Sequence, residues 1–206
     1  MKRLGKILLS AFIIALCGIN CKTNAQISLD SYYNIDWQFN IPLNNRFSNT
    51  ASGWGMNFEG GYYLNQEIAV GGFLSFHTNN EYLSRRTINI GGNQSINTAQ
   101  QHQMFTLPFG VLARYRFVES DFQPYVGMKL GACYAEFNNY YYIFMRQEKR
   151  WGLYLSPEVG FNYYPWPNSI GFHFAMYYSF ATNRCAIMSY DQSTLNNFGF
   201  RVGLAF

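Results

Sequence analysis

The stretch FTLPFGVLARYRF, residues 105–117, decides the fold class of this sequence. Every second residue from Phe105 to Phe117 is apolar, and Arg114 lies on the opposite parity. A period of two residues is that of a β-strand, whose side chains alternate between the two faces of a sheet. The stretch therefore predicts a strand with one apolar face and one face that carries charge.

The same alternation recurs along the rest of the chain and predicts eight strands. We expect them near residues 29–41, 54–64, 68–77, 105–117, 126–134, 151–163, 170–180 and 198–206. The connections near 65–67, 118–121 and 165–168 are short, whereas those near 42–52, 79–101, 137–150 and 181–194 are longer and mostly polar. Up-and-down membrane barrels have short periplasmic turns and long outer loops. The predicted fold class is all-β, an eight-stranded antiparallel up-and-down transmembrane β-barrel.

The N-terminal segment has the features of a secretory signal peptide. A start with two lysines and one arginine precedes an apolar core at residues 7–16, and Thr-Asn-Ala ends at Ala25. An apolar core of about ten residues is too short for a transmembrane helix, which needs about 20. We expect cleavage after Ala25, export to the cell outer membrane, and a mature barrel domain at residues 26–206.

Removal of this segment changes the charge of the protein. The segment holds four of the 15 basic residues and none of the 11 acidic residues, so the mature chain carries equal numbers of each. The balance gives no indication of a nucleic-acid partner. Aromatic residues make up 19% of the sequence, an unusually large share for an ordinary soluble core.

Charged residues near the middle of the strands decide which face points inward. They are Glu59, Arg114, Lys129, Glu158 and Arg201, all on the face opposite the apolar one. In a narrow barrel these groups meet only if that face lines the lumen, where opposite charges can compensate the cost of burial. The apolar face then meets lipid, which requires a closed sheet. A soluble ligand-binding barrel would reverse the two faces.

The lumen charges have two interpretations. The first is a fixed salt-bridge plug, which we favour because eight strands leave an interior just wide enough for side chains. The second is a polar path or gate for small solutes.

Aromatic residues gather toward the strand ends, as the two water–lipid interfaces require. Trp54, Trp151 and Phe180 mark one end, and Tyr62, Tyr115, Tyr163 and Trp166 mark the other.

Two prolines, Pro108 and Pro157, lie inside predicted strands. A closed barrel has no free edge where a missing N–H is harmless. We expect a local bulge or a water-satisfied carbonyl at each proline.

Three motifs resemble a known family. They are Leu107-Pro108-Phe109-Gly110 continuing to Tyr115, Gln123-Pro124-Tyr125-Val126-Gly127 continuing to Gly131, and Phe198 to Phe206 with its aromatic last residue. The chain is similar to the eight-stranded outer-membrane barrels that include the OmpA transmembrane domain, OmpX and OmpW, and to the porin-family outer membrane β-barrel proteins. The resemblance implies architecture and recognition of Phe206 by the barrel-assembly machinery. It does not specify activity, because this fold hosts many functions.

The sequence shows no pattern of a catalytic, cofactor or metal site. His77, His102 and His173 fall on separate strands without the spacing of metal ligands. We expect no enzyme and no cofactor. Only Cys133 and Cys185 remain in the mature chain, and a disulfide between them is left open.

The outer connections carry a second set of candidate residues. Residues 79–101 contain Arg85 and Arg86 and form a candidate protruding hairpin, and residues 137–150 combine aromatic rings with basic groups. Exposed rings beside arginine suit contact with a protein, a glycan or a lipopolysaccharide phosphate. In the alternative, the rings extend the outer girdle and the bases lie at the anionic leaflet. The candidates in the second connection are Tyr140, Tyr141, Tyr142 and Arg146.

Two functional hypotheses follow from these features. The first is a non-enzymatic, porin-like barrel for passive passage of small or apolar solutes. The alternative is a structural or adhesin-like barrel whose outer loops bind a partner. In either case the expected surroundings are outer-membrane lipid and lipopolysaccharide, with a monomeric barrel and no nucleic acid.

Overall fold

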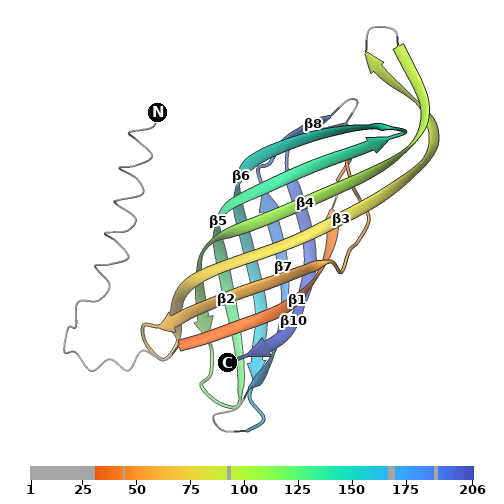
Figure 1. The fold of residues 1–206 in the computed structure, drawn as a ribbon. Coiled ribbons are helices and arrows are strands. Elements are labelled where there is room, and N and C mark those ends of the chain that lie inside the picture. The colour runs from red at the N-terminus through yellow and green to blue at the C-terminus, as the bar shows by residue number, and fades with distance from the viewer. Residues whose placement is uncertain (1–30, 44, 92–93, 167–169, 188–189) are drawn as a thin grey trace, which may run out of the picture.

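Eight antiparallel strands hydrogen-bond around a closed ring in the computed structural model, which describes residues 31–43, 45–91, 94–166, 170–187 and 190–206. The order around the ring is β1-β10-β7-β6-β5-β4-β3-β2 (Figure 1). The barrel strands are β1 (Ser31–Leu43), β2 (Gly55–Tyr63), β3 (Ile68–Gly91), β4 (Gln94–Arg116), β5 (Phe122–Tyr141), β6 (Phe144–Tyr163), β7 (Gly171–Ala181) and β10 (Leu195–Ala205). β8 (Cys185–Ile187) and β9 (Tyr190–Gln192) form a small separate hairpin that is not part of the ring. The predicted fold class is confirmed.

The ring closes where the first and last strands meet. β1 pairs with β10 from Asn34 opposite Ala205 to Leu43 opposite Asn196. The pairing continues at Phe206, whose N–H donates to the Tyr33 carbonyl at 2.8 Å and whose carbonyl accepts from the Tyr33 N–H at 3.1 Å. No strand in the ring is left with a free edge, as a sheet surrounded by hydrocarbon requires.

The two faces of the strands have the predicted sidedness. Along β1, Tyr33, Ile35 and Trp37 are exposed, whereas the alternate residues Asn34 and Asp36 are buried. The other strands continue this exposed apolar surface around the barrel. Among the described residues, no helix is long and apolar enough to cross a membrane.

Four strands are much longer than the sequence predicts. β3 and β4 have 24 and 23 residues, and β5 and β6 have 20 each. The regions expected as loops near 79–101 and 137–150 are therefore mostly paired strand, and in Figure 1 the β3–β4 hairpin projects far beyond the end of the barrel opposite the C-terminus. The prediction of loops there was wrong because neither face of these segments meets lipid. Without an apolar face, the alternation that reports a strand disappears while the backbone pairing continues.

The region near 181–194 is also not a simple loop. β8 and β9 lie within it and pair from Cys185 opposite Gln192 to Ile187 opposite Tyr190. The residues of the predicted signal peptide and its cleavage site lie outside the described part of the chain.

The prolines are accommodated without bulges. Pairing between β3 and β4 is interrupted at Ser75 and Phe76, opposite Pro108 and Leu107, and the register is the same on both sides of the gap. Between β6 and β7 the gap falls at Ser156 and Pro157, again with the register kept. Of the two predicted alternatives, the bulge is therefore not found at either proline.

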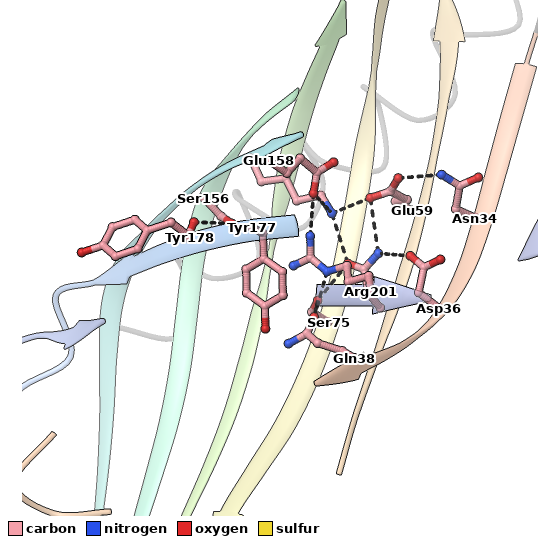
Figure 2. A network of polar contacts seen from close by, with 12 residues as sticks. Asn34, Asp36, Gln38, Glu59, Ser75, Ser156, Glu158, Tyr177, Tyr178 and Arg201 are labelled. Carbon is pink, nitrogen blue, oxygen red and sulfur yellow. Dashed lines mark hydrogen bonds and ion pairs between the residues drawn. The ribbon is translucent and has the colours of Figure 1, made fainter. Parts of the chain in front are cut away.

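A side chain replaces the donor that Pro157 lacks. Pro157 lies opposite Tyr178 in the β6–β7 register, and the Ser156 hydroxyl donates to the Tyr178 carbonyl at 2.9 Å (Figure 2). The expected water is unnecessary at this carbonyl because the preceding serine supplies the hydrogen bond.

We predict that Ser156→Ala lowers the free energy of unfolding by about 1–3 kcal/mol, because the Tyr178 carbonyl loses its buried donor. The double variant Ser156→Ala/Pro157→Ala restores a backbone N–H opposite that carbonyl and is expected to recover most of the loss. Urea unfolding in detergent micelles measures both effects. Equal stability of the single variant and the wild type would contradict this role of Ser156.

Candidate functional site

The lumen is crossed by a continuous network of buried charges. Glu59, on β2, accepts a hydrogen bond from Asn34 Nδ2 at 2.8 Å and forms ion pairs with Arg114 and Lys129. These partners come from β1, β4 and β5, so the Glu59 carboxylate joins four strands. The three charged side chains are almost completely shielded from solvent.

The network continues to the opposite wall. Lys129 Nζ lies 2.9 Å from Glu158 Oε2, and Arg201 Nη1 lies 2.5 Å from the same oxygen. Arg201 Nε also donates to Gln38 Oε1 at 2.9 Å, and Figure 2 shows the guanidinium between Glu158 and Gln38. The structure therefore brings together all five lumen residues singled out from the sequence.

A sixth charge escaped the sequence analysis. Asp36 accepts from Asn57 Nδ2 at 2.8 Å and lies 2.6 Å from His173 Nδ1, and His173 Nε2 lies 2.6 Å from the Tyr125 hydroxyl. With Asp36, three acidic side chains are buried among the described residues, Asp36, Glu59 and Glu158, against four basic ones, Arg114, Arg116, Lys129 and Arg201. The inward parity of Asp36 in the first strand was the available signal, but the sequence alone did not connect it to His173 and Tyr125.

Aromatic rings fill the space around the cations. The Arg114 guanidinium carbon lies 4.2 Å from the Tyr32 ring centroid and 3.6 Å from that of Tyr125. Arg201 lies 4.0 Å from the centroid of Tyr177. Such contacts stabilise a desolvated cation through the negative face of the ring. The cross-section is thus occupied by paired charges and rings.

The outer mouth holds a second obstruction, the outer plug, formed by Phe47, His102, Phe137 and Tyr190. The Asn45 carboxamide accepts from the N–H groups of Phe47 and Ser48, at 2.9 and 3.2 Å, and shapes this turn. Phe47 stacks on His102 with centroids 4.5 Å apart, and its ring meets Phe137 and Tyr190 edge-on. Three polypeptide segments that are distant in sequence, from the β1–β2 connection, the β4–β5 hairpin and β9, therefore meet over the lumen.

The segment that leads into the β8–β9 hairpin is held against the barrel wall beside this plug. Asn183 Nδ2 donates to the carbonyls of Cys133 and Arg150 at 2.9 and 3.0 Å. Cys133 and Cys185 are both buried and are free thiols, which answers the disulfide question left open by the sequence.

Beyond the membrane-facing surface, β5 and β6 carry a polar belt. Tyr134 and Trp151 are paired in the register, with ring centroids 5.2 Å apart. They mark the outer end of the lipid-facing aromatic residues on these two strands, which we call the last aromatic row. Glu136, Asn138, Gln147 and Lys149 follow on the same face, and Glu136 accepts from Asn138 Nδ2 at 3.0 Å and Gln147 Nε2 at 2.6 Å. The Asn138 hydrogen bond lowers the pKa of Glu136, so this belt stays charged at neutral pH.

Apolar side chains return at the tip of the hairpin. Tyr142, Ile143, Phe144 and Met145 are 82%, 77%, 55% and 50% exposed. Tyr142 lies eight residues beyond Tyr134, which at about 3.3 Å per residue and a tilt near 40° places the tip about 20 Å outside the aromatic row. The belt and this distance argue against the alternative in which these rings extend the outer girdle.

The remaining outer candidates do not form one site. Arg85 and Tyr142 line a common groove of about 480 Å³ with residues 96–99, whereas Arg86 contacts the Tyr190 hydroxyl and lies 5.7 Å from its ring centroid. Tyr140 and Arg146 are exposed, and Tyr141 is half-buried against Phe144. The tip and the groove thus combine Arg85, Tyr140, Tyr142 and Arg146, and Arg86 belongs to the outer plug.

The described residues contain no group of three or more His, Cys, Asp or Glu side chains placed to hold a metal ion. His77 contacts Gln38 and Thr106, His102 contacts Phe47, and His173 contacts Asp36.

A comparison of the sequence with known protein families agrees with this architecture of a closed ring, an apolar outer surface and a charged interior. Residues 12–206 match the model of the outer membrane protein beta-barrel domain. The chain belongs to this family. Membership places this barrel protein in the outer membrane of a Gram-negative bacterium. No curated protein matches its sequence.

A comparison with solved structures finds similar outer membrane proteins. Neisserial surface protein A matches with a TM-score of 0.51 and 13% identity, covering 85% of this chain and 95% of that one. The attachment invasion locus protein Ail of Yersinia pestis has a TM-score of 0.46 and 14% identity over 85% and 97% of the two chains. The outer membrane protease OmpT of Escherichia coli has a TM-score of 0.48 and 12% identity over 74% and 62%. At 13% identity the likeness to Neisserial surface protein A concerns the fold only.

We predict that Lys129→Met lowers the free energy of unfolding by about 3–5 kcal/mol, because Glu59 and Glu158 lose the cation between them. The matched control is Lys149→Met, which removes an exposed ion pair of 3.8 Å with Glu136 and should change stability by less than about 1 kcal/mol. Urea unfolding in micelles compares the two. Similar small effects for both variants would contradict a stabilising lumen network.

The outer plug is predicted to loosen in acid. Burial lowers the pKa of His102 below its ordinary value of 6.5, although the hydrogen bond to the Phe47 carbonyl and the nearby Glu81 oppose the shift. A histidine whose folded pKa is depressed binds more protons when it is released, so plug stability falls as the pH drops below about 6.5. Hydrogen exchange of residues 45–52 should therefore be faster at pH 5 than at pH 7.5. His102→Gln should remove this difference, and a pH-independent wild type would contradict it.

Proposed function

We propose that the protein is a non-enzymatic surface-interaction barrel, in which the sealed barrel anchors two outer hairpins that bind a partner outside the cell. The observation that carries this proposal is the contrast between the filled lumen and the exposed outer hairpins. Paired charges and rings occupy the lumen, while β3–β4 and β5–β6 continue past the last aromatic row as exposed strands.

The distribution of charge supports the same function. Among the described residues, the part of the chain outside the aromatic row carries seven basic and four acidic side chains. The basic residues are Arg46, Arg85, Arg86, Arg146, Lys149, Arg150 and Arg184, and the acidic ones are Glu81, Glu136, Glu148 and Asp191. A net positive outer end attracts anionic surfaces. Lys149 and Arg150, next to Trp151, are suitably placed for lipopolysaccharide phosphates.

Passage of small or apolar solutes has less support. A solute that crosses the lumen would have to separate Lys129 from Glu158 and Arg201 from Glu158, and then displace Phe47 from the outer plug. Breaking buried ion pairs costs several kcal/mol. We therefore favour surface binding over the porin-like function.

The proposal is tested by shortening β5–β6. Residues 138–147 are replaced by Asn-Gly, which joins Phe137 to Glu148, two residues that already face each other in the register. Cells with the wild-type protein should adhere to lipid-, glycan- or protein-coated surfaces more strongly than cells without it, and the shortened variant should lose this gain. Heat-modifiable migration in gels verifies that the variant barrel is folded.

Planar-bilayer recording provides the complementary measurement. The wild-type protein should give no steady conductance, because its lumen is blocked at two levels. Stable channel openings together with adhesion that does not depend on residues 138–147 would overturn the proposed function.

A further inference from the structure

The turn at the end of β5–β6 breaks the usual chemistry of a tight hairpin. Tyr142 has a φ of 54°, which makes it a non-glycine residue with positive φ, and Ile143 follows it in the turn. This left-handed conformation is unfavourable for a side chain with a Cβ, and glycine or asparagine normally occupies it. The tip therefore keeps an aromatic residue where the backbone favours glycine.

Burial within the protein does not explain this choice. Tyr142 and Ile143 are the most exposed residues of the tip. Departures from local folding rules that bring no packing gain are found where a sequence serves function. The chemistry displayed at residues 140–145 is therefore the feature to be explained.

The shape and composition of the tip favour a lipid bilayer over other occupants. A hairpin end is convex, and a convex apolar surface is covered either by a deep pocket in a partner or by a deformable apolar phase. The side chains from Tyr142 to Met145 offer only a tyrosine hydroxyl for hydrogen bonding, which is poorly suited to a glycan. Tyrosine, with an apolar ring and a polar end, is typical of membrane interfaces.

The positions of the basic groups follow the same order as the layers of a bilayer surface. Arg146 comes directly after the apolar segment, and Arg85 lines the groove beside Tyr142. Within the described residues neither arginine has a carboxylate within ion-pair distance, whereas Glu136, Glu148 and Asp191 already face Lys149, Arg150 and Arg184. Apolar groups followed by free cations match hydrocarbon followed by anionic phosphates.

We propose that the 140–146 tip inserts its apolar side chains into an opposing lipid bilayer, with Arg85 and Arg146 at anionic headgroups. The membrane is a second one, because the polar belt and about 20 Å of hairpin separate the tip from the bilayer that holds the barrel. This inference rests on the proposed function and specifies the partner of the outer hairpins.

The test uses the full barrel in phosphatidylcholine nanodiscs and adds vesicles with or without phosphatidylglycerol. In flotation, the wild-type protein should bind the phosphatidylglycerol vesicles. Tyr142→Gly should weaken this binding about tenfold, since one large apolar side chain contributes roughly one factor of ten or more. The same substitution should leave the urea midpoint unchanged or raise it, because glycine suits the turn. Loss of binding with retained stability separates function from folding.

Two further variants serve as controls. Tyr82→Ser removes a tyrosine of β3 that is 71% exposed but lies outside the tip, and should leave vesicle binding unchanged. Arg146→Gln should weaken binding to phosphatidylglycerol vesicles and reduce its salt dependence. Equal losses for Tyr82→Ser and Tyr142→Gly would overturn the assignment to the tip.

An environment-sensitive fluorophore on Ile143→Cys distinguishes the two membranes; Cys133 and Cys185 are buried. Its emission should shift to the blue only after vesicles are added. A blue shift in the nanodisc alone would place the tip on its own bilayer and overturn the proposal. If no vesicle binds while adhesion to a protein- or glycan-coated surface still requires residues 138–147, the lipid inference fails and the proposed function stands.

Discussion

Closure of the strand ring is the constraint on which the rest of the structure depends. In hydrocarbon, each backbone N–H and C=O needs a partner within the protein, and only a sheet without edges provides one at every strand. With eight strands the enclosed space is just wide enough for side chains. Every second residue must therefore either fill this narrow interior or contact lipid.

The interior charges are a consequence of that narrowness. Glu59 and Glu158 are surrounded by Arg114, Lys129 and Arg201, so the cations and carboxylates compensate each other across several strands. The Coulomb attraction within such a network offsets a large desolvation penalty. Its main effect is that removal of any member leaves a buried charge without a partner. The arrangement favours a rigid anchor over an open conduit.

The outer hairpins are free of this constraint. Water surrounds β3–β4 and β5–β6 beyond the last aromatic row, so both of their faces can be polar and their backbone pairing alone maintains the strands. An apolar tip on such a ribbon has no role in closing or filling the barrel. Tyr142 is the clearest example of a residue that does not serve the barrel fold, because its backbone conformation is unfavourable and its side chain is exposed.

The sequence by itself determined the number of barrel strands, their sidedness and the five lumen charges, because period-two alternation records which residues meet lipid and which meet the interior. It missed the strand extensions for the same reason: where neither face meets lipid, no alternation remains. Only the tertiary structure decided that Asp36 joins His173 and Tyr125, that Ser156 replaces the donor missing at Pro157, and that Phe47 closes the outer mouth. These contacts join residues brought together by ring closure and register, and side-chain alternation along one strand contains no information about which neighbour lies across the lumen.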